Sequence, residues 1–224
     1  MVEINGKNVR IFSDDKPNYV LIHPTGKHEL DNISSVFVKI RSENDKRFCL
    51  ASFEVEKWNA ELSPWCASQA FGNEPFGDGA SDTLKYITDS LIPALAGMQN
   101  LNNSVKYICG GYSLAGLFSL WAAYNSDVFS AVSCCSPSVW IEGWTEYTST
   151  RNPMVKNIYL SIGSKENRTG NPVLKTVRER IEFQHEILTV NKINTSLEIN
   201  HGNHFQDNIE RVVKGYLWCL DNCD

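Results

Sequence analysis

The chain of 224 residues has no apolar run that approaches the length of about eighteen residues typical of a membrane-spanning helix. It also has no excess of positive charge, since 21 Lys and Arg stand against 26 Asp and Glu, for a formal net charge of −5. Without a basic patch, nucleic acid and anionic membranes are not expected as partners. Residues 1–7 lack the basic and apolar regions of a signal peptide, which predicts a cytoplasmic protein.

The cysteines show neither a disulfide framework nor a metal site. Their number is odd, at seven, and no two of them have the C-x-x-C spacing. Two cysteines near the C-terminus do not by themselves make a zinc site. Together with the missing signal peptide, these features predict free thiols in a reducing compartment, and neither a metal nor another cofactor. The cysteines are Cys49, Cys66, Cys109, Cys134, Cys135, Cys219 and Cys223.

Apolar runs alternate along the chain with segments of helical periodicity, a pattern that predicts a mostly parallel sheet with helices on both faces. Near the start, the Asn5-Gly6 pair is a hairpin signal, and it predicts an antiparallel pair of strands with Val2 opposite Val9. No repeat or boundary divides the chain, so one domain is expected over residues 1–224. Strands are expected at residues 19–22, 48–55, 105–109, 129–135, 157–163 and 195–200, and helices at 30–42, 81–95, 117–123, 171–188 and 206–220.

Ser113 lies in the most informative segment, Gly111-Tyr112-Ser113-Leu114-Ala115, between a predicted strand and a predicted helix. A serine at such a turn, with Gly or Ala two positions before and after it, is typical of a nucleophile elbow. Strand and helix close over each other there, so only small residues fit. The free N–H groups of the helix N-terminus would stabilise negative charge. A helix N-cap after a glycine-rich turn is the alternative interpretation of this serine.

Two later loops supply an acid and a base, in the chain order of α/β-hydrolase triads. Glu166 follows the expected strand 157–163, and His204 follows the expected strand 195–200. Because open α/β sheets carry their sites at the carboxyl ends of the strands, we expect both residues to lie near Ser113.

With these motifs the sequence resembles the α/β-hydrolase superfamily, and within it the esterase branch that includes enterochelin esterases and S-formylglutathione hydrolases. The resemblance covers the chain from Tyr19 onward and implies an α/β-hydrolase fold, and the short chain leaves no room for a large lid. It also favours His204 over the neighbouring His201 as the base, because a Gly-x-His loop before the last helix matches the branch. The residues that carry the resemblance are 111–116, 129–140, 163–166 and 202–205.

The expected chemistry is acyl transfer to Ser113, with His204 taking the serine proton and returning it to the leaving group. Small soluble esters or thioesters are the expected substrates. A catalytically weak or inactive hydrolase-fold protein that works as a binding module is the alternative.

The oxyanion is expected to be held by the Leu114 backbone N–H and by one from Thr25 or Gly26. The segment differs here from the His-Gly element of the branch, since Pro24 has no N–H. This departure favours the binding-module alternative.

Glu166 has two rivals for the role of the acid. Glu198 lies inside an expected strand and would point sideways, and Asp207 is interpreted as an acid in the first turn of the last helix. A surface carboxylate paired with Lys165 or Arg168 is the alternative interpretation of Glu166.

Tryptophans are concentrated in two expected loops, at residues 56–79 and 136–152. Indole rings near a predicted site suggest an aromatic-lined substrate pocket, although core and loop anchors are the alternative. The residues expected to line the pocket are Trp58, Trp65, Tyr112 and Trp140.

Overall fold

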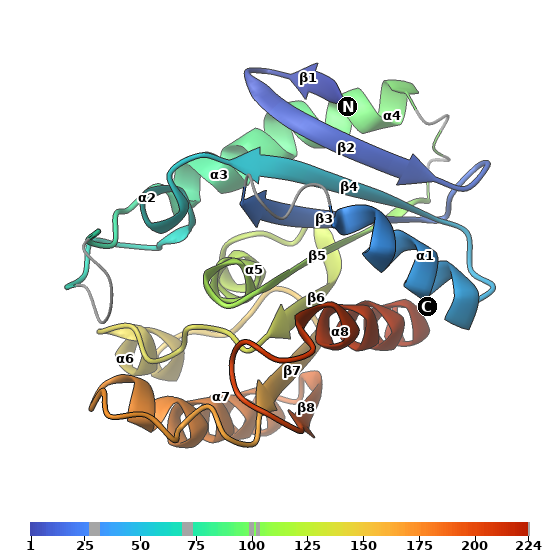
Figure 1. Ribbon diagram of the computed structural model, residues 1–224. Helices are drawn as coiled ribbons and strands as arrows, with labels where there is room; N and C mark the ends of the chain where they lie inside the picture. The colour runs from blue at the N-terminus through green and yellow to red at the C-terminus, as the bar shows by residue number, and fades with distance from the viewer. Residues whose placement is uncertain (27–31, 69–73, 99–100, 102–103, 224) are drawn as a thin grey trace.

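The structure, a computed structural model, describes residues 1–26, 32–68, 74–98, 101 and 104–223. Within these residues, eight strands form one sheet in the order β1-β2-β4-β3-β5-β6-β7-β8 (Figure 1). β1 (Val2–Ile4) and β2 (Lys7–Ser13) form the predicted hairpin, with Val2 opposite Val9, and β2 is antiparallel to β4. The other pairs are parallel, and their strands are β3 (Tyr19–Gly26), β4 (Phe48–Val55), β5 (Lys106–Tyr112), β6 (Phe129–Cys135), β7 (Asn157–Gly163) and β8 (Asn194–Asn200).

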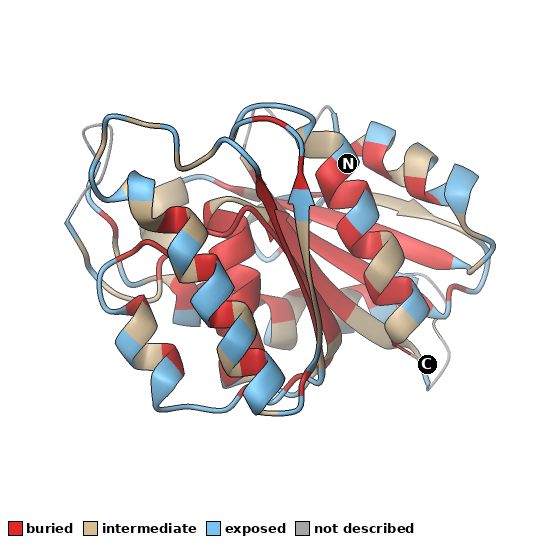
Figure 2. Ribbon diagram, turned by 90° about the horizontal axis from the view of Figure 1, so that it is seen from below, coloured by how far each residue is buried: buried red, intermediate tan, exposed pale blue. Residues whose placement is uncertain are grey.

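Helices cover both faces of this sheet, as the sequence predicts (Figures 1 and 2). α1 (Ile33–Glu43) and α8 (Asn208–Asn222) lie side by side over one face. α5 (Leu114–Asn125) is central to the opposite face, together with the helices on either side of it. The remaining helices are α2 (Trp58–Leu62), α3 (Ala80–Tyr86), the π-helical η1 (Ile87–Leu91), α4 (Ile92–Met98), α6 (Trp144–Ser149), the 3-10 helix η2 (Leu174–Thr176) and α7 (Val177–Val190).

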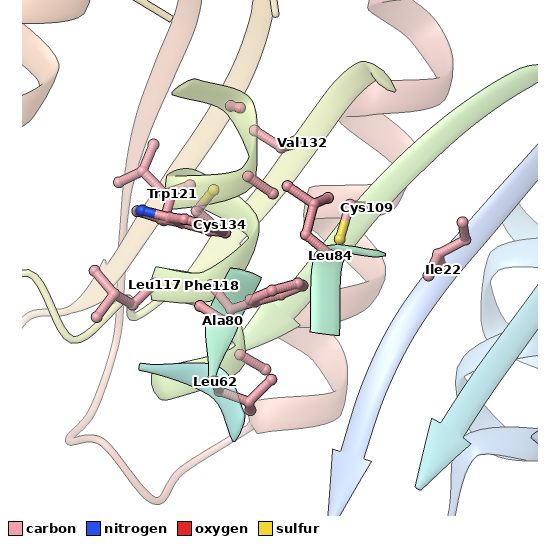
Figure 3. Close-up of a cluster of buried hydrophobic side chains, with 14 of the residues drawn as sticks. Ile22, Leu62, Ala80, Leu84, Cys109, Leu117, Phe118, Trp121, Val132 and Cys134 are labelled. Carbon is pink, nitrogen blue, oxygen red and sulfur yellow. The ribbon is translucent and has the colours of Figure 1, made fainter. Parts of the chain in front are cut away.

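The apolar core has two parts, one on each face of the sheet, because successive side chains of a strand point to opposite faces. In β3, Val20 and Ile22 lie in the cluster under α5, and Leu21 lies in the cluster under α1 and α8. All three are fully buried, which is the pattern expected for a parallel strand covered on both sides. Figure 3 shows part of the first cluster, with Leu117 and Phe118 of α5 among its members.

β3 is longer than the predicted strand 19–22 and includes the whole His-Pro-Thr-Gly segment. Its pairing with β5 stops at Ile22, whereas its pairing with β4 continues as far as Gly26 opposite Val55. Among the described residues, only one side of β3 has a partner strand beyond Ile22. A proline, which has no N–H to donate, is tolerated in such a partly unpaired strand end.

Some predicted helix boundaries are wrong. The helix expected at 171–188 begins at Val177, after η2, so Pro172 is not in its first turn. Ser81 lies inside α3 and does not cap it. The last helix begins at Asn208, because Asp207 adopts a left-handed conformation with φ 55°. Leu30, the expected start of the first helix, lies outside the described residues.

The segment between β6 and β7 contains one short helix, α6, in agreement with the expectation that no large lid is present. The loop expected at 56–79 contains α2 and an isolated β-bridge between Ala67 and Phe76, and its residues 69–73 lie outside the described part of the chain. In the described residues no helix has the length and apolarity required to span a bilayer.

Close packing of α5 on β6 requires glycine at position 116. A Cβ there would lie 2.8 Å from the carbonyl oxygen of Cys135, whereas a Cβ at Gly97 in α4 would meet nothing within 4 Å. We therefore expect Gly116→Ala to lower the free energy of unfolding by about 1–3 kcal/mol through overpacking. Gly97→Ala, the matched control, should raise it by up to about 1 kcal/mol through helix propensity. Urea denaturation measures both, and equal effects would contradict the close approach.

Candidate active site

Ser113 stands between β5 and α5 with φ 58° and ψ −117°, a conformation that L residues rarely adopt. Two observations explain how the turn is held. The Ser113 N–H donates to the carbonyl of Cys135 at 2.9 Å, and a Cβ on Gly111 would lie 2.5 Å from the Cβ of Ala115. The small residues predicted for an elbow are therefore required by contact. Ser113 occupies the N-cap position of α5, but its side chain makes no capping hydrogen bond and contacts His204 instead.

The structure brings Ser113, His204 and Glu166 together at the carboxyl edge of the sheet. His204 Nε2 lies 3.0 Å from Ser113 Oγ, and His204 Nδ1 lies 2.8 Å from Glu166 Oε2. Because an ionised carboxylate only accepts hydrogen bonds, Nδ1 carries the proton and Nε2 is left to accept the serine hydroxyl. Each side chain comes from a separate segment: the end of β5, the turn after β7 and the loop between β8 and α8.

Glu166 is buried, with 3% of its side chain exposed. Its Oε1 accepts hydrogen bonds from the Gly163 N–H at 2.6 Å, Ser136 Oγ at 2.7 Å and Arg211 Nη1 at 2.8 Å. Burial raises the pKa of this carboxyl, but hydrogen bonds from His204, Ser136 and the Gly163 N–H outweigh burial and hold the pKa below its ordinary value of 4.5. Glu166 is therefore ionised at neutral pH.

The alternative of a surface carboxylate is wrong for Glu166, because Lys165 and Arg168 are exposed while Glu166 is buried against other partners. Glu198 accepts a hydrogen bond from Tyr159 at 2.7 Å and pairs with Lys214, so it is turned away from His204.

Asp207 and His201, the remaining candidates for the acid and the base, do not contact the site in the way those roles require. Asp207, expected in the first turn of the last helix, lies just before α8, because its backbone is left-handed and not helical. His201 is exposed, and its contact in the site is through its backbone carbonyl. Of the two histidines of this loop, His204 is the one that contacts Ser113.

Arg211 of α8 is a residue of the site that the sequence analysis missed. Its side chain is 1% exposed. Nη1 donates to Glu166 at 2.8 Å and to the Tyr112 hydroxyl at 2.9 Å, and Nη2 donates to the carbonyls of His201 at 3.0 Å and Asn203 at 2.9 Å. Burial raises the pKa of Tyr112 to about 12, so its hydroxyl keeps its proton and donates to the His204 carbonyl at 2.8 Å.

A sequence signal for Arg211 does exist. Gly215 and Cys219 follow it at four-residue spacing, which places the three on one face of a helix, and all three are buried. Small residues on that face let α8 approach the sheet closely. An arginine at the end of such a stripe has to lie against the sheet edge.

His23, in the end of β3, is a third histidine near the site and is unsuited to act as a base. Its Nδ1 lies 2.9 Å from the Tyr216 hydroxyl, which in turn donates to the Ile22 carbonyl at 3.2 Å. Burial lowers the pKa of His23 to about 4, so the ring is neutral and weakly basic.

A cleft of about 1470 Å³ opens around Ser113. Trp58, Tyr112 and Trp140 lie in its wall, where the sequence predicted them. The prediction for Trp65 is wrong, because its Nε1 donates to the Glu142 carbonyl at 2.8 Å and its ring stacks on the buried Trp144 outside the cleft.

The residues expected to hold an oxyanion also border this cleft: Leu114, Thr25 and Gly26. Leu114 is the first residue of α5, and the first bond along the helix runs from Leu117 N–H to the Ser113 carbonyl, so the Leu114 N–H points out of the helix end. The Thr25 hydroxyl bonds Ser52, so the group that Thr25 could direct to an oxyanion is its backbone N–H. Their role in catalysis stays a prediction.

In the described part of the chain, no three His, Cys, Asp or Glu side chains lie close enough together to hold a metal ion. The seven cysteines are free thiols, and Cys66 is the exposed one.

A mostly parallel sheet with a strained serine after β5, an acid after β7 and a histidine after β8 is the architecture of an α/β hydrolase. A family model named Esterase, with the description "Putative esterase", matches residues 46–207, which is most of the sequence. The chain belongs to this esterase family, and the resemblance found in the sequence is confirmed.

Several known proteins are similar to this chain. The chain is 25% identical over 179 residues to "Uncharacterized protein YbbA" of Bacillus subtilis (strain 168), a match that covers 75% of this chain and 72% of that protein. The solved structure of siderophore hydrolase EstA from Aspergillus nidulans has a TM-score of 0.74 at 15% identity, covering 94% of this chain and 84% of that one. An IroE-like serine hydrolase from Shewanella oneidensis has a TM-score of 0.71 at 14% identity, covering 97% and 74%. These likenesses establish the α/β-hydrolase fold.

Replacing Glu166 with Gln leaves Arg211 buried without its carboxylate, so we expect a loss of about 3–5 kcal/mol in the free energy of unfolding at pH 7. The folded-state pKa lies below the ordinary value of 4.5. The contribution of Glu166 to stability is therefore present above that value and is lost as the pH falls through the folded-state pKa. The difference between wild type and variant should therefore shrink in urea denaturation as the pH falls below about 4.5.

Glu198→Gln is the control, because its carboxylate is a surface partner of Lys214. It should cost less than about 1 kcal/mol at pH 7. A Glu166→Gln difference that stays constant over the same pH range would contradict the ionised, buried state of Glu166.

Proposed function

We propose that this esterase-family protein is a serine hydrolase that cleaves small carboxylic esters or thioesters through an acyl-enzyme on Ser113. One observation carries the proposal: a continuous hydrogen-bond line runs from Ser113 Oγ through His204, at 3.0 Å and 2.8 Å, to the buried Glu166 carboxylate. Nucleophile, base and orienting acid within hydrogen-bond reach of one another are what activation of a serine requires.

In the first step the Ser113 oxygen attacks the acyl carbon while His204 Nε2 takes the hydroxyl proton. The carbonyl electron pair moves onto oxygen, and the resulting oxyanion is held by the Leu114 N–H at the N-terminus of α5. Collapse of this intermediate breaks the bond to the alcohol or thiol, which leaves with the proton of His204. Water then attacks the acyl-enzyme by the same proton transfers. Throughout, Glu166 stays ionised and stabilises the imidazolium.

The second oxyanion donor in this proposal is a backbone N–H of Thr25 or Gly26, at the end of β3. Both residues border the cleft beside Ser113. Pro24 directly before them has no N–H, which is the observation that favours a weakly active binding module as the alternative.

The cleft also bears on the substrate. Its volume of about 1470 Å³ exceeds the range of about 300–1000 Å³ typical of small-molecule sites. The apolar side chains of Trp58, Phe76 and Trp140 line part of it. Among small esters, we therefore expect those with larger acyl or alcohol groups to be turned over better than acetates. Siderophore esters belong in the substrate panel, because one similar structure is a siderophore hydrolase.

A cytoplasmic location is part of the proposal. The seven cysteines are free, and the exposed Cys66 thiol persists best in a reducing compartment.

Turnover of p-nitrophenyl acetate by wild type and Ser113→Ala tests the proposal directly. We expect kcat to fall by about 10⁴–10⁶-fold in the variant, because the nucleophile is removed. Ser149→Ala, an exposed serine on α6, is the control and should match wild type. Wild-type rates equal to buffer on the whole ester and thioester panel would favour the binding module instead.

Two further variants test the identity of the acid. Glu166→Gln should lower kcat by about 10²–10⁴-fold with little change in KM, because the carboxylate acts on the imidazolium of the transition state. Asp207→Asn should stay near wild type in kcat and in melting temperature, since Asn tolerates the left-handed backbone at this position. An inactive Asp207→Asn beside an active Glu166→Gln would reverse the assignment and leave Ser113 and His204 in place.

A further inference from the structure

We propose that Arg211 is a positioning residue for the site: it acts through the Glu166 carboxylate and the backbone of the loop 201–204 to fix the imidazole of His204 against Ser113. The inference rests on the proposed function and deepens it. Arg211 does not touch the space in which an acyl group would react, so its effect on the chemistry has to pass through other residues.

The first connection is to the acid. Arg211 Nη1 bonds Oε1 of Glu166 at 2.8 Å, and His204 Nδ1 bonds Oε2 at 2.8 Å. The two donors therefore do not compete for one oxygen. Arg211 shares Oε1 with the Ser136 hydroxyl and the Gly163 N–H, and the imidazole holds Oε2. These bonds together restrain rotation of the carboxylate and fix the direction from which His204 is held.

The second connection is to the loop that carries the base. Arg211 Nη2 donates to the carbonyls of His201 at 3.0 Å and Asn203 at 2.9 Å. The carbonyl of His204 accepts from the Tyr112 hydroxyl at 2.8 Å, and that hydroxyl itself accepts from Arg211 Nη1 at 2.9 Å. Three carbonyls of one short loop are thus held by a single guanidinium or by the tyrosine bonded to it.

These contacts need the planar fork of arginine. Nη1 and Nη2 diverge, one toward the acid and one toward the loop, whereas a lysine ammonium is a point donor that reaches one of them. Stability alone does not account for the residue. A buried ion pair often stabilises no better than apolar residues would, and within the described residues Arg211 Nε is buried without a hydrogen-bond partner.

The pH dependence of kcat/KM distinguishes this role from a purely structural one, because Arg211 carries a charge near His204. Protonated His204 lies beside the anion of Glu166 and near the cation of Arg211. Of the residues that the structure describes, the other charged or titratable side chains on the elements around the cleft are His23 of β3, Glu56 after β4, Tyr112 of β5, the exposed Lys165 and Arg168 after β7, His201 and Asp207 in the loop before α8, and Glu210 of α8. Removing only the Arg211 cation favours the protonated imidazole, so the acid limb of the kcat/KM profile should move to higher pH.

The experiment compares Arg211→Met and Arg211→Lys with Lys214→Met, which removes an exposed cation from the same helix. Using the p-nitrophenyl ester that wild type turns over best, we expect Arg211→Met to lower kcat by about 10–100-fold, the scale of a small misplacement of reacting groups. KM should change little. Arg211→Lys should recover only part of the loss, and Lys214→Met should behave like wild type.

Introducing Arg211→Met into the Glu166→Gln variant distinguishes a positioning role from a general loss of structure. If Arg211 acts through the carboxylate, Arg211→Met should cost at least about threefold less in that background than in wild type, as expected for coupled residues. An equal cost in the two backgrounds, or an acid limb unmoved by Arg211→Met, overturns the inference. Should Arg211→Met fail to fold by circular dichroism, Arg211→Lys in both backgrounds gives the same comparison of kcat.

Failure of this inference is distinct from failure of the proposed function. Turnover that survives Ser113→Ala overturns the serine mechanism, whatever Arg211 does. Turnover that depends on Ser113 and keeps its wild-type kcat in Arg211→Met overturns the role of Arg211 alone.

Discussion

The buried carboxylate of Glu166 is the group around which the rest of the site is arranged. An isolated carboxylate taken out of water costs several kcal/mol, so it remains charged only where hydrogen bonds replace its hydration. Ser136 follows β6, Gly163 ends β7, Arg211 belongs to α8 and His204 precedes α8, and each gives this carboxylate a hydrogen bond. Since these donors meet only when the carboxyl edge of the sheet has closed against α8, the charged site and the fold form together.

The strained elbow depends on the same sheet edge. Ser113 is held in its unfavourable conformation from both sides: its N–H bonds Cys135 at the end of β6, and its carbonyl accepts from Leu117 in α5 and Ser138 after β6. A conformation of this kind costs on the order of 1–3 kcal/mol and persists only where its surroundings fix it. Parallel pairing of β5 with β6 supplies that restraint, and it also brings the loop with Ser136 to the acid.

Local patterns in the sequence were sufficient for the parts of the fold that local contacts decide. The hairpin register follows from Asn5-Gly6, and the elbow follows from small residues around one serine. Features set by distant neighbours could not be read in this way. Trp65 lies outside the cleft because its ring stacks on Trp144, a residue far along the chain. Arg211 has partners at the end of β5 and in the segments that follow β6, β7 and β8, and no spacing within α8 alone reveals which carboxylate it meets.

An arginine bound to the acid has opposite effects on a histidine base. Its positive charge offsets part of the attraction between the Glu166 anion and the imidazolium of His204, and at a buried site this attraction is less screened than in water. Its fork, however, fixes both the carboxylate and the loop that carries the imidazole. Correct placement of reacting groups is worth several kcal/mol in the barrier, and a displacement of about 1 Å costs up to about 100-fold in rate. In the proposed mechanism, therefore, the geometry held by Arg211 outweighs the electrostatic attraction that it removes.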